Sequence, residues 1–199
     1  MKSIGRASVA IALIILSLIV IAGCSKVDVP TASQPTTEDG MGLWTPRTGD
    51  HVFPGDAIPM YRAGYVESQF GMAVNPLNVP NATLHIGPEG GVLHLGRHTL
   101  TVPAGAVTTD ITFRIAWASL TAVAADCTPS GLTFNAPLTL TLCYAGTQYE
   151  NMANPNLAIF YAQDDGSFER YPSVVDPVAK TVSAPLHHFS RYILSGTNE

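Results

Sequence analysis

Short runs of alternating apolar and polar residues, separated by turn residues, fill the chain from residue 82 onward. In the clearest run, Ile111, Phe113, Ile115 and Trp117 alternate with polar or small residues. Alternation with a period of two places every second side chain on one face of a strand, and that face is buried. The pattern therefore predicts an all-β fold, a single antiparallel β-sandwich of about eight or nine short strands over residues 81–195.

The strand segments are separated by sequences that are typical of turns. The strongest turn signal is Asp164-Asp165-Gly166-Ser167, where aspartate and glycine fit a hairpin. The ten candidate segments from which these eight or nine strands would form are 82–86, 92–95, 98–102, 111–117, 132–134, 138–144, 157–162, 168–171, 180–183 and 189–194.

The composition narrows the class of protein further. The 199 residues are enough for one domain and a tether, and 17 glycines and 15 prolines favour short strands over helices. The net charge is −5, and no cluster of Lys or Arg follows Gly23. Since nucleic-acid binding usually needs a basic surface, we expect no nucleic-acid partner.

The amino-terminal segment, residues 1–24, has the organisation of an export signal. Lys2 and Arg6 precede an apolar run over residues 9–21, which is short for a membrane-spanning helix. The run ends in Ile21-Ala22-Gly23-Cys24, which resembles the bacterial lipobox. The resemblance implies cleavage before Cys24, diacylglycerol on its sulfur and an acyl chain on its amine. An uncleaved membrane anchor is the alternative.

The lipobox implies a cell-envelope protein that is held to a membrane by its lipid. Ser25 follows Cys24, where an Asp would favour the inner membrane of a Gram-negative cell, so we expect the outer membrane. Two or three acyl chains anchor firmly, whereas one holds only marginally. Residues 24–40 are rich in Ser, Thr, Pro and Asp and are predicted to be a lipidated flexible tether.

Residues 41–80 combine aromatic residues with prolines. The aromatic side chains indicate packing, whereas the prolines exclude long regular elements. We predict irregular chain that partly packs on the domain, with a short strand or helical turn over residues 60–70. The aromatic residues either cover an exposed edge of the sandwich, which we favour, or form a partner-binding surface. They are Trp44, Phe53, Tyr61, Tyr65 and Phe70.

The β domain resembles a known family in its turn-and-strand motifs. Gly90-Gly91-Val92-Leu93 and Leu100 to Val107, with the sequence LTVPAGAV, are similar to the opening of ZU-five domains. Residues 137–144 and 186–192 resemble later parts of the same family, especially its bacterial secreted members. The resemblance implies a β-sandwich that works as a protein-interaction module. Its animal partners do not carry over, so an unknown envelope protein or glycan is the expected partner.

Cys127 and Cys143 are the two cysteines that remain after Cys24. Outside the cytoplasm an even pair indicates a disulfide, which would close a loop of roughly 15 residues and contribute about 3 kcal/mol. Two separate thiols are the alternative, because a disulfide requires Cα atoms within about 7 Å.

The triplet His188-Phe189-Ser190 is the strongest candidate for chemistry. In some ZU-five proteins a His-Phe-Ser sequence cleaves itself between Phe and Ser. The resemblance implies attack of the Ser190 hydroxyl on the preceding carbonyl, with His188 as base, followed by hydrolysis of the ester. In the alternative interpretation Phe189 packs in the core and Ser190 belongs to the last strand.

The histidines are not predicted to form a metal site. Zinc or copper would need three or four converging ligands, and His94 points away from its apolar neighbours by the period of two. We therefore expect surface histidines, no metal and no cofactor beyond the lipid on Cys24. These histidines are His85, His94, His98, His187 and His188.

The sequence thus favours a non-enzymatic, lipid-anchored binding or structural module of the cell envelope. No G-x-S-x-G, phosphate loop, Rossmann fingerprint or paired-cysteine zinc pattern is present. A self-processing domain that acts at Phe189-Ser190 is the second hypothesis. A metal-dependent or hydrolytic envelope enzyme is the third.

Overall fold

The structure is a computed structural model that describes residues 59–71, 74, 79–163 and 167–197. These residues all belong to the larger of two units of the chain, Thr36–Glu199. The predicted signal peptide (1–23), the tether (24–40) and residues 41–58 lie outside the described residues. So do the tip of the predicted hairpin at 164–166 and the candidate lipidation site, Cys24.

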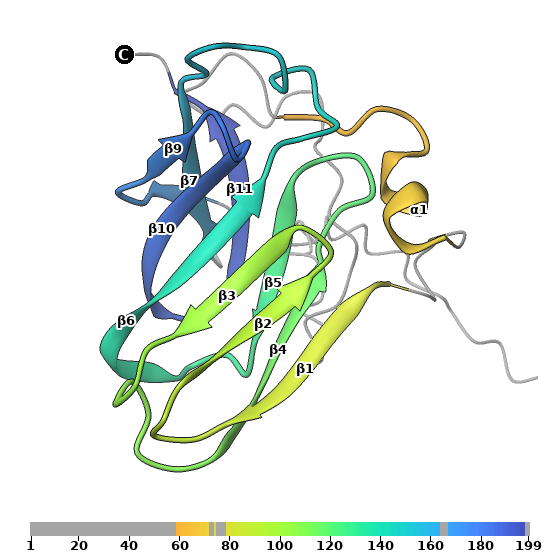
Figure 1. Cartoon of the computed structure of the whole chain (residues 1–199). Helices are drawn as coiled ribbons and strands as arrows, with labels where there is room; N and C mark the ends of the chain where they lie inside the picture. Colours follow the sequence, from red (N-terminus) through yellow and green to blue (C-terminus); the bar gives the residue numbers. More distant parts are fainter. Residues whose placement is uncertain (1–58, 72–73, 75–78, 164–166, 198–199) are drawn as a thin grey trace, which may run out of the picture. The chain divides into compact units, whose positions relative to one another are not determined.

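The described residues form two antiparallel sheets, which confirms the β-sandwich (Figure 1). One sheet has six strands in the order β1-β4-β5-β11-β7-β8, and the other has five in the order β2-β3-β6-β10-β9. None of the helices in the described ranges is long and apolar enough to cross a membrane. The elements are α1 (Tyr65–Phe70), β1 (Asn81–Ile86), β2 (Gly91–Leu95), β3 (His98–Val102), β4 (Ile111–Trp117), β5 (Ala124–Thr128), β6 (Thr133–Cys143), β7 (Leu157–Ala162), β8 (Phe168–Arg170), β9 (Val174–Asp176), β10 (Thr181–His188) and β11 (Arg191–Gly196).

The alternating residues build the core between the sheets, as the sequence predicts. Phe113 and Ile115 of β4 face inward from the six-stranded sheet, and both are fully buried. Leu138, Leu140 and Leu142 of β6 do the same from the five-stranded sheet. The hydrophobic effect over this shared interior holds the two sheets together.

The described residues contain eleven strands, whereas the sequence indicates about eight or nine. Strand β5, with the sequence AADCT, is absent from the predicted segments because small residues on both faces hide the alternation. Strand β9 has only three residues. β6 and β10 also continue through Pro137 and Pro185. Pro137 lies where the pairing with β10 shifts register, so its missing N–H interrupts no regular ladder.

The segment before the sandwich closes one end of it. Met60 forms a bridge with Ala122, and Tyr61 forms one with Thr147. The Tyr61 ring stacks on Trp117 of β4, with ring centres 6.0 Å apart. Helix α1 follows, so both predicted elements, a short extended stretch and a helical turn, occur within residues 60–70.

The aromatic residues of this segment pack on the domain, as predicted. We expected them to cover an exposed edge of the sandwich, but they contact residues at its end. Phe70 meets Trp117 edge to face at 5.4 Å, and Tyr65 stacks on Tyr61 at 5.1 Å. Tyr61 also reaches His98 of β3, which belongs to the opposite sheet. The segment therefore joins the two sheets at the open end of the sandwich. Trp44 and Phe53 lie outside the described residues.

Candidate functional site

The triplet His188-Phe189-Ser190 spans the turn from β10 to β11. Phe189 is 3% exposed and packs edge to face against Phe113 and Phe134, at 5.2 and 4.9 Å between ring centres. Phe189 is therefore a core residue, as one interpretation expected. Ser190 lies in the turn and not in the last strand, since β11 begins at Arg191.

Hydrogen bonds hold this turn in place from three sides. The Tyr192 hydroxyl donates to the His188 carbonyl oxygen at 2.6 Å, a bond from a tyrosine back to a carbonyl a few residues upstream, as at the tyrosine corner of β-sandwiches. The backbone N–H of Cys127 donates to the Ser190 carbonyl oxygen at 3.0 Å. The Ser190 hydroxyl donates to the carbonyl oxygen of Ala162 at 3.4 Å.

His188, the base that self-cleavage would use, is directed at Tyr171. His188 Nε2 lies 2.9 Å from the Tyr171 hydroxyl, and its ring packs edge to face against Tyr161 at 4.7 Å. Among the described residues no hydrogen bond joins His188 to Ser190. The arrangement fixes the entry to β11, with His188 Nε2 engaged by Tyr171 and the Ser190 hydroxyl engaged by the Ala162 carbonyl.

Cys127 and Cys143 are both buried, free thiols. Cys127 lies on β5 of the six-stranded sheet and Cys143 ends β6 of the other, so the structure does not join them in a disulfide. The alternative of two separate thiols therefore holds in this structure. Burial raises the pKa of both thiols, and the charge of Asp126 adds to the shift at Cys127. Because the thiolate is the reactive form, neither thiol is primed as a nucleophile.

His98 is in the core, which corrects the expectation that all the histidines lie on the surface. It is 1% exposed and shares the inward face of β3 with Leu100 and Val102. Its ring lies 4.3 Å from that of Trp117. The sequence held this signal, because His98 has the same parity as two residues of a predicted strand. His94 is exposed, as the period of two predicts.

The contacts of His98 define its protonation state. The backbone N–H of Cys143 donates to Nδ1 at 3.0 Å, so Nδ1 is an acceptor and the proton resides on Nε2. Nε2 then donates to the Tyr61 hydroxyl oxygen at 3.0 Å. Burial lowers the pKa of His98 to about 3, so the imidazole is neutral around neutral pH. His98 therefore joins three segments as a neutral side chain.

A partly buried ion pair crosses from β5 to β11, and sequence reasoning missed it. Arg191 Nε donates to Asp126 Oδ1 at 2.7 Å and Nη2 donates to Oδ2 at 3.0 Å. Burial raises the pKa of Asp126, and the guanidinium of Arg191 opposes that shift. The pair was not predicted because its carboxylate sits on β5, the strand that the sequence did not reveal.

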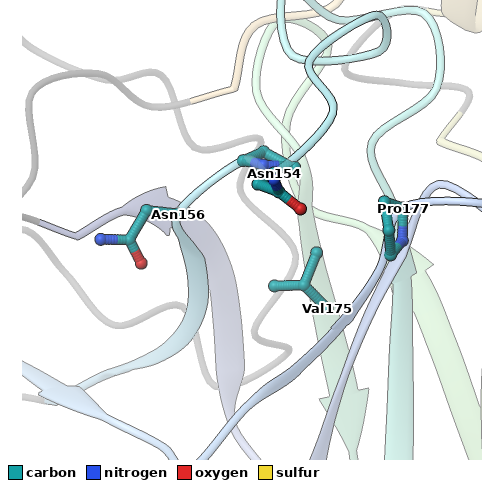
Figure 2. Close-up of a pocket in the computed structure, with 5 residues that line it drawn as sticks. Asn154, Asn156, Val175 and Pro177 are labelled. Atoms are coloured by element: carbon teal, nitrogen blue, oxygen red, sulfur yellow. The ribbon is translucent and has the colours of Figure 1, made fainter.

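A shallow hollow lies between the loop before β7 and strand β9 (Figure 2). It has a volume of about 320 Å³ and is open to solvent. Asn156 is held there by Thr197, whose carbonyl oxygen accepts from Nδ2 at 2.6 Å. The lining contains no titratable side chain, so it offers amide and apolar contacts rather than acid–base catalysis. The lining residues are Asn154, Pro155, Asn156, Val175 and Pro177.

The described residues hold no group of three or more His, Cys, Asp or Glu side chains that could bind a metal ion. No protein-family model and no curated protein sequence matches the chain. The similarity to ZU-five domains stays a prediction from the motifs around Gly90 and His188. The structure agrees with that prediction in its fold, since the described residues form a β-sandwich.

Proposed function

We propose that this chain is a lipid-anchored module of a bacterial cell envelope that binds a protein or a glycan or serves a structural role. The observation that carries the proposal is the sequence Ile21-Ala22-Gly23-Cys24 at the end of an apolar run. Cleavage before Cys24 would leave a chain whose first residue carries lipid. With two or three acyl chains, such an anchor holds firmly to a bilayer.

The contacts in the domain support binding over acid–base chemistry. His98 joins Tyr61 to the Cys143 backbone, and Asp126 is held in a bidentate ion pair. His188 is turned to the Tyr171 hydroxyl. These groups, which could otherwise act as acids or bases, are engaged in holding strands and turns together.

The exposed apolar side chains near the hollow are compatible with a binding role. Val174 is 73% exposed and Val178 is 91% exposed, on the hairpin that contains β9 and leads into β10.

Metabolic labelling with palmitate tests the anchor. We expect the label in the wild-type chain and none in Cys24→Ala, because the diacylglycerol is joined through the sulfur of that residue. Cys127→Ala, which removes a buried thiol of the domain, serves as the matched control and should keep the label. An unlabelled wild type, or equal label in Cys24→Ala, would refute the proposal.

Membrane fractionation and envelope binding test the rest. Wild-type protein should remain with the membrane after a high-salt wash, whereas a lipid-free version, in which a fully removed secretory signal replaces residues 1–24, should be released. This lipid-free version, once purified, should bind isolated envelope in a saturable manner, and protease or glycosidase treatment of the envelope tells a protein partner from a glycan. Binding that never saturates would contradict the binding role.

A further inference from the structure

The outer faces of the two sheets differ in chemical character. The five-stranded sheet presents hydroxyl groups, among them Thr139 on its exposed face and the bonded pair Thr141 Oγ1 and Ser183 Oγ at 2.8 Å. The outer face of the six-stranded sheet carries the Asp126–Arg191 ion pair and, beside it on β5, β11 and β7, a patch of small and apolar side chains. Strand pairing places them side by side: Ala124 opposite Ile193, and Ile193 opposite Phe160. A sheet with one solvated face would have polar residues at these positions.

This apolar face is buried, although it points away from the core. Ala118, Ala124, Ile193, Ala158 and Phe160 are each at most 1% exposed. Ala118, Ala124 and Ile193 form a cluster separate from the core, to which Ala162 and Phe168 add partly buried surface. Among the described residues the members of this cluster all come from the sheet and the residue after β4. The face therefore requires a cover that is not part of the two sheets.

A polar group on the same face also calls for a partner. Ser195 pairs with Ala158 across β11 and β7 and alternates with the inward-facing Leu194. It is fully buried, and its Oγ has no hydrogen-bond partner in the described part of the chain. A buried hydroxyl without a partner costs about 1–3 kcal/mol. Backbone groups of a segment laid across β7 and β11 could supply the missing bond.

The chain enters the sandwich beside this face. The Val123 N–H donates to the Pro59 carbonyl oxygen at 3.1 Å, next to Ala124, and Tyr61 N–H donates to the Thr121 carbonyl oxygen at 2.7 Å. The segment 41–58 immediately precedes that point. Fully extended it could span about 60 Å, whereas six strands spaced about 4.8 Å apart are about 24 Å across.

The composition of residues 41–58 fits the face. The segment contains Trp44, Phe53, Leu43, Val52 and Ile58. The alanine side chains of this patch are short and leave space for bulky side chains, and one buried aromatic residue covers about 150–250 Å². The prolines in this segment disfavour an added regular strand, but they allow irregular chain that lies across the sheet.

We propose that residues 41–58 lie across the outer face of the six-stranded sheet as an intramolecular cover, with Trp44 and Phe53 supplying apolar contacts to β5, β11 and β7. The cover shortens the free tether, a consequence that rests on the proposed lipid at Cys24. A flexible chain over residues 25–40 has a mean end-to-end distance of about 22 Å, compared with about 32 Å over residues 25–58. The domain would stay closer to the bilayer.

Photo-crosslinking in the full chain tests the cover. A benzophenone amino acid replaces Trp44 or Phe53, and a third variant carries it at Ser33 in the tether. We expect adducts from positions 44 and 53 on peptides that contain Ala124, Ala158 or Ile193, at least five-fold above position 33. Mixing isotope-labelled and unlabelled chains identifies adducts between copies. Adducts only to a second copy, to lipid or to another protein, or equal yield at position 33, would overturn the proposal.

A pair of substitutions separates docking from chance proximity. Ala158→Arg places a charge on the outer face of β7, and Thr139→Arg places one on the outer face of the five-stranded sheet. The first should reduce the intramolecular adducts several-fold, and the second should leave them unchanged. Near-ultraviolet circular dichroism of the buried aromatic cluster checks that each variant is folded. Undiminished adducts in folded Ala158→Arg would count against the cover, and the wild-type adduct map decides the matter if that variant does not fold.

Discussion

Lowering the pH from 7 to 5 should destabilise the domain by about 2 kcal/mol through the protonation of His98 in the unfolded chain. The ring is enclosed by Trp117, Tyr61 and the Cys143 backbone. Burial lowers its pKa to about 3, so it stays neutral in the folded protein at both pH values. In the unfolded chain a histidine takes up a proton near pH 6.5.

The sign of the effect follows from proton linkage. Between pH 6.5 and about 3 the unfolded chain binds a proton at His98 that the folded protein does not. Stability is therefore lost as the pH falls through this window. The maximal slope is about 1.4 kcal/mol per pH unit, and pH 5 lies about 1.5 units below the unfolded pKa, which gives about 2 kcal/mol.

Urea unfolding at pH 7 and pH 5, followed by tryptophan fluorescence, measures this loss. His98→Gln can still accept from the Cys143 N–H and donate to Tyr61, but it cannot titrate, so its loss of stability should be smaller by about 2 kcal/mol. His94→Gln removes an exposed histidine and serves as the control, with the wild-type pH dependence. Equal pH dependence in wild type and His98→Gln would refute the reasoning.

Three further predictions concern local packing and the turn before β11. Gly146→Ala should cost about 2 kcal/mol or more in urea unfolding, because a Cβ would overlap the Tyr65 ring at a φ of 81°. Arg191→Met should cost about 2 kcal/mol at pH 7, since it leaves the Asp126 carboxylate buried without its partner, and the cost should shrink as the pH falls. Intact mass should show one uncut chain in the wild type, identical to Ser190→Ala apart from the substitution; a wild-type product that begins at residue 190 would contradict the geometry of that turn.

Matched variants isolate the cause in the first two predictions. Gly131→Ala also places an alanine at a positive φ of 78°, but nothing lies within 4 Å of its added Cβ, so it should cost less than Gly146→Ala. Arg62→Met removes the exposed ion pair with Glu150, which is worth at most about 1 kcal/mol. Equal costs in the glycine pair would show that overlap with the Tyr65 ring does not set the loss of stability. Equal costs in the arginine pair would show that burial of the ion pair does not set it.

The sequence predicted those strands in which one face is buried and the other is polar. β4 and β6 carry that alternation, and their inward residues are the ones expected. β5 does not, because Ala124 faces a buried outer surface while Ala125 faces the core. A strand that is buried on both faces has no alternation to detect. The same omission hid Asp126 and its pairing with Arg191.

The candidate site was predicted in its residues but not in its contacts. Phe189 was expected in the core and is there. The hydrogen bonds of His188 to Tyr171 and of Tyr192 to His188 depend on how β8, β10 and β11 meet, which no local pattern specifies. The burial of His98 also depends on a distant segment, since Tyr61 lies 37 residues earlier in the chain.

The mass of the amino-terminal peptide of membrane-purified protein tests the central proposal most directly. We predict a peptide that begins at Cys24 and carries diacylglycerol on the sulfur, with or without an acyl chain on the amine. A peptide that retains residues 1–23, or an unmodified Cys24, would contradict the account.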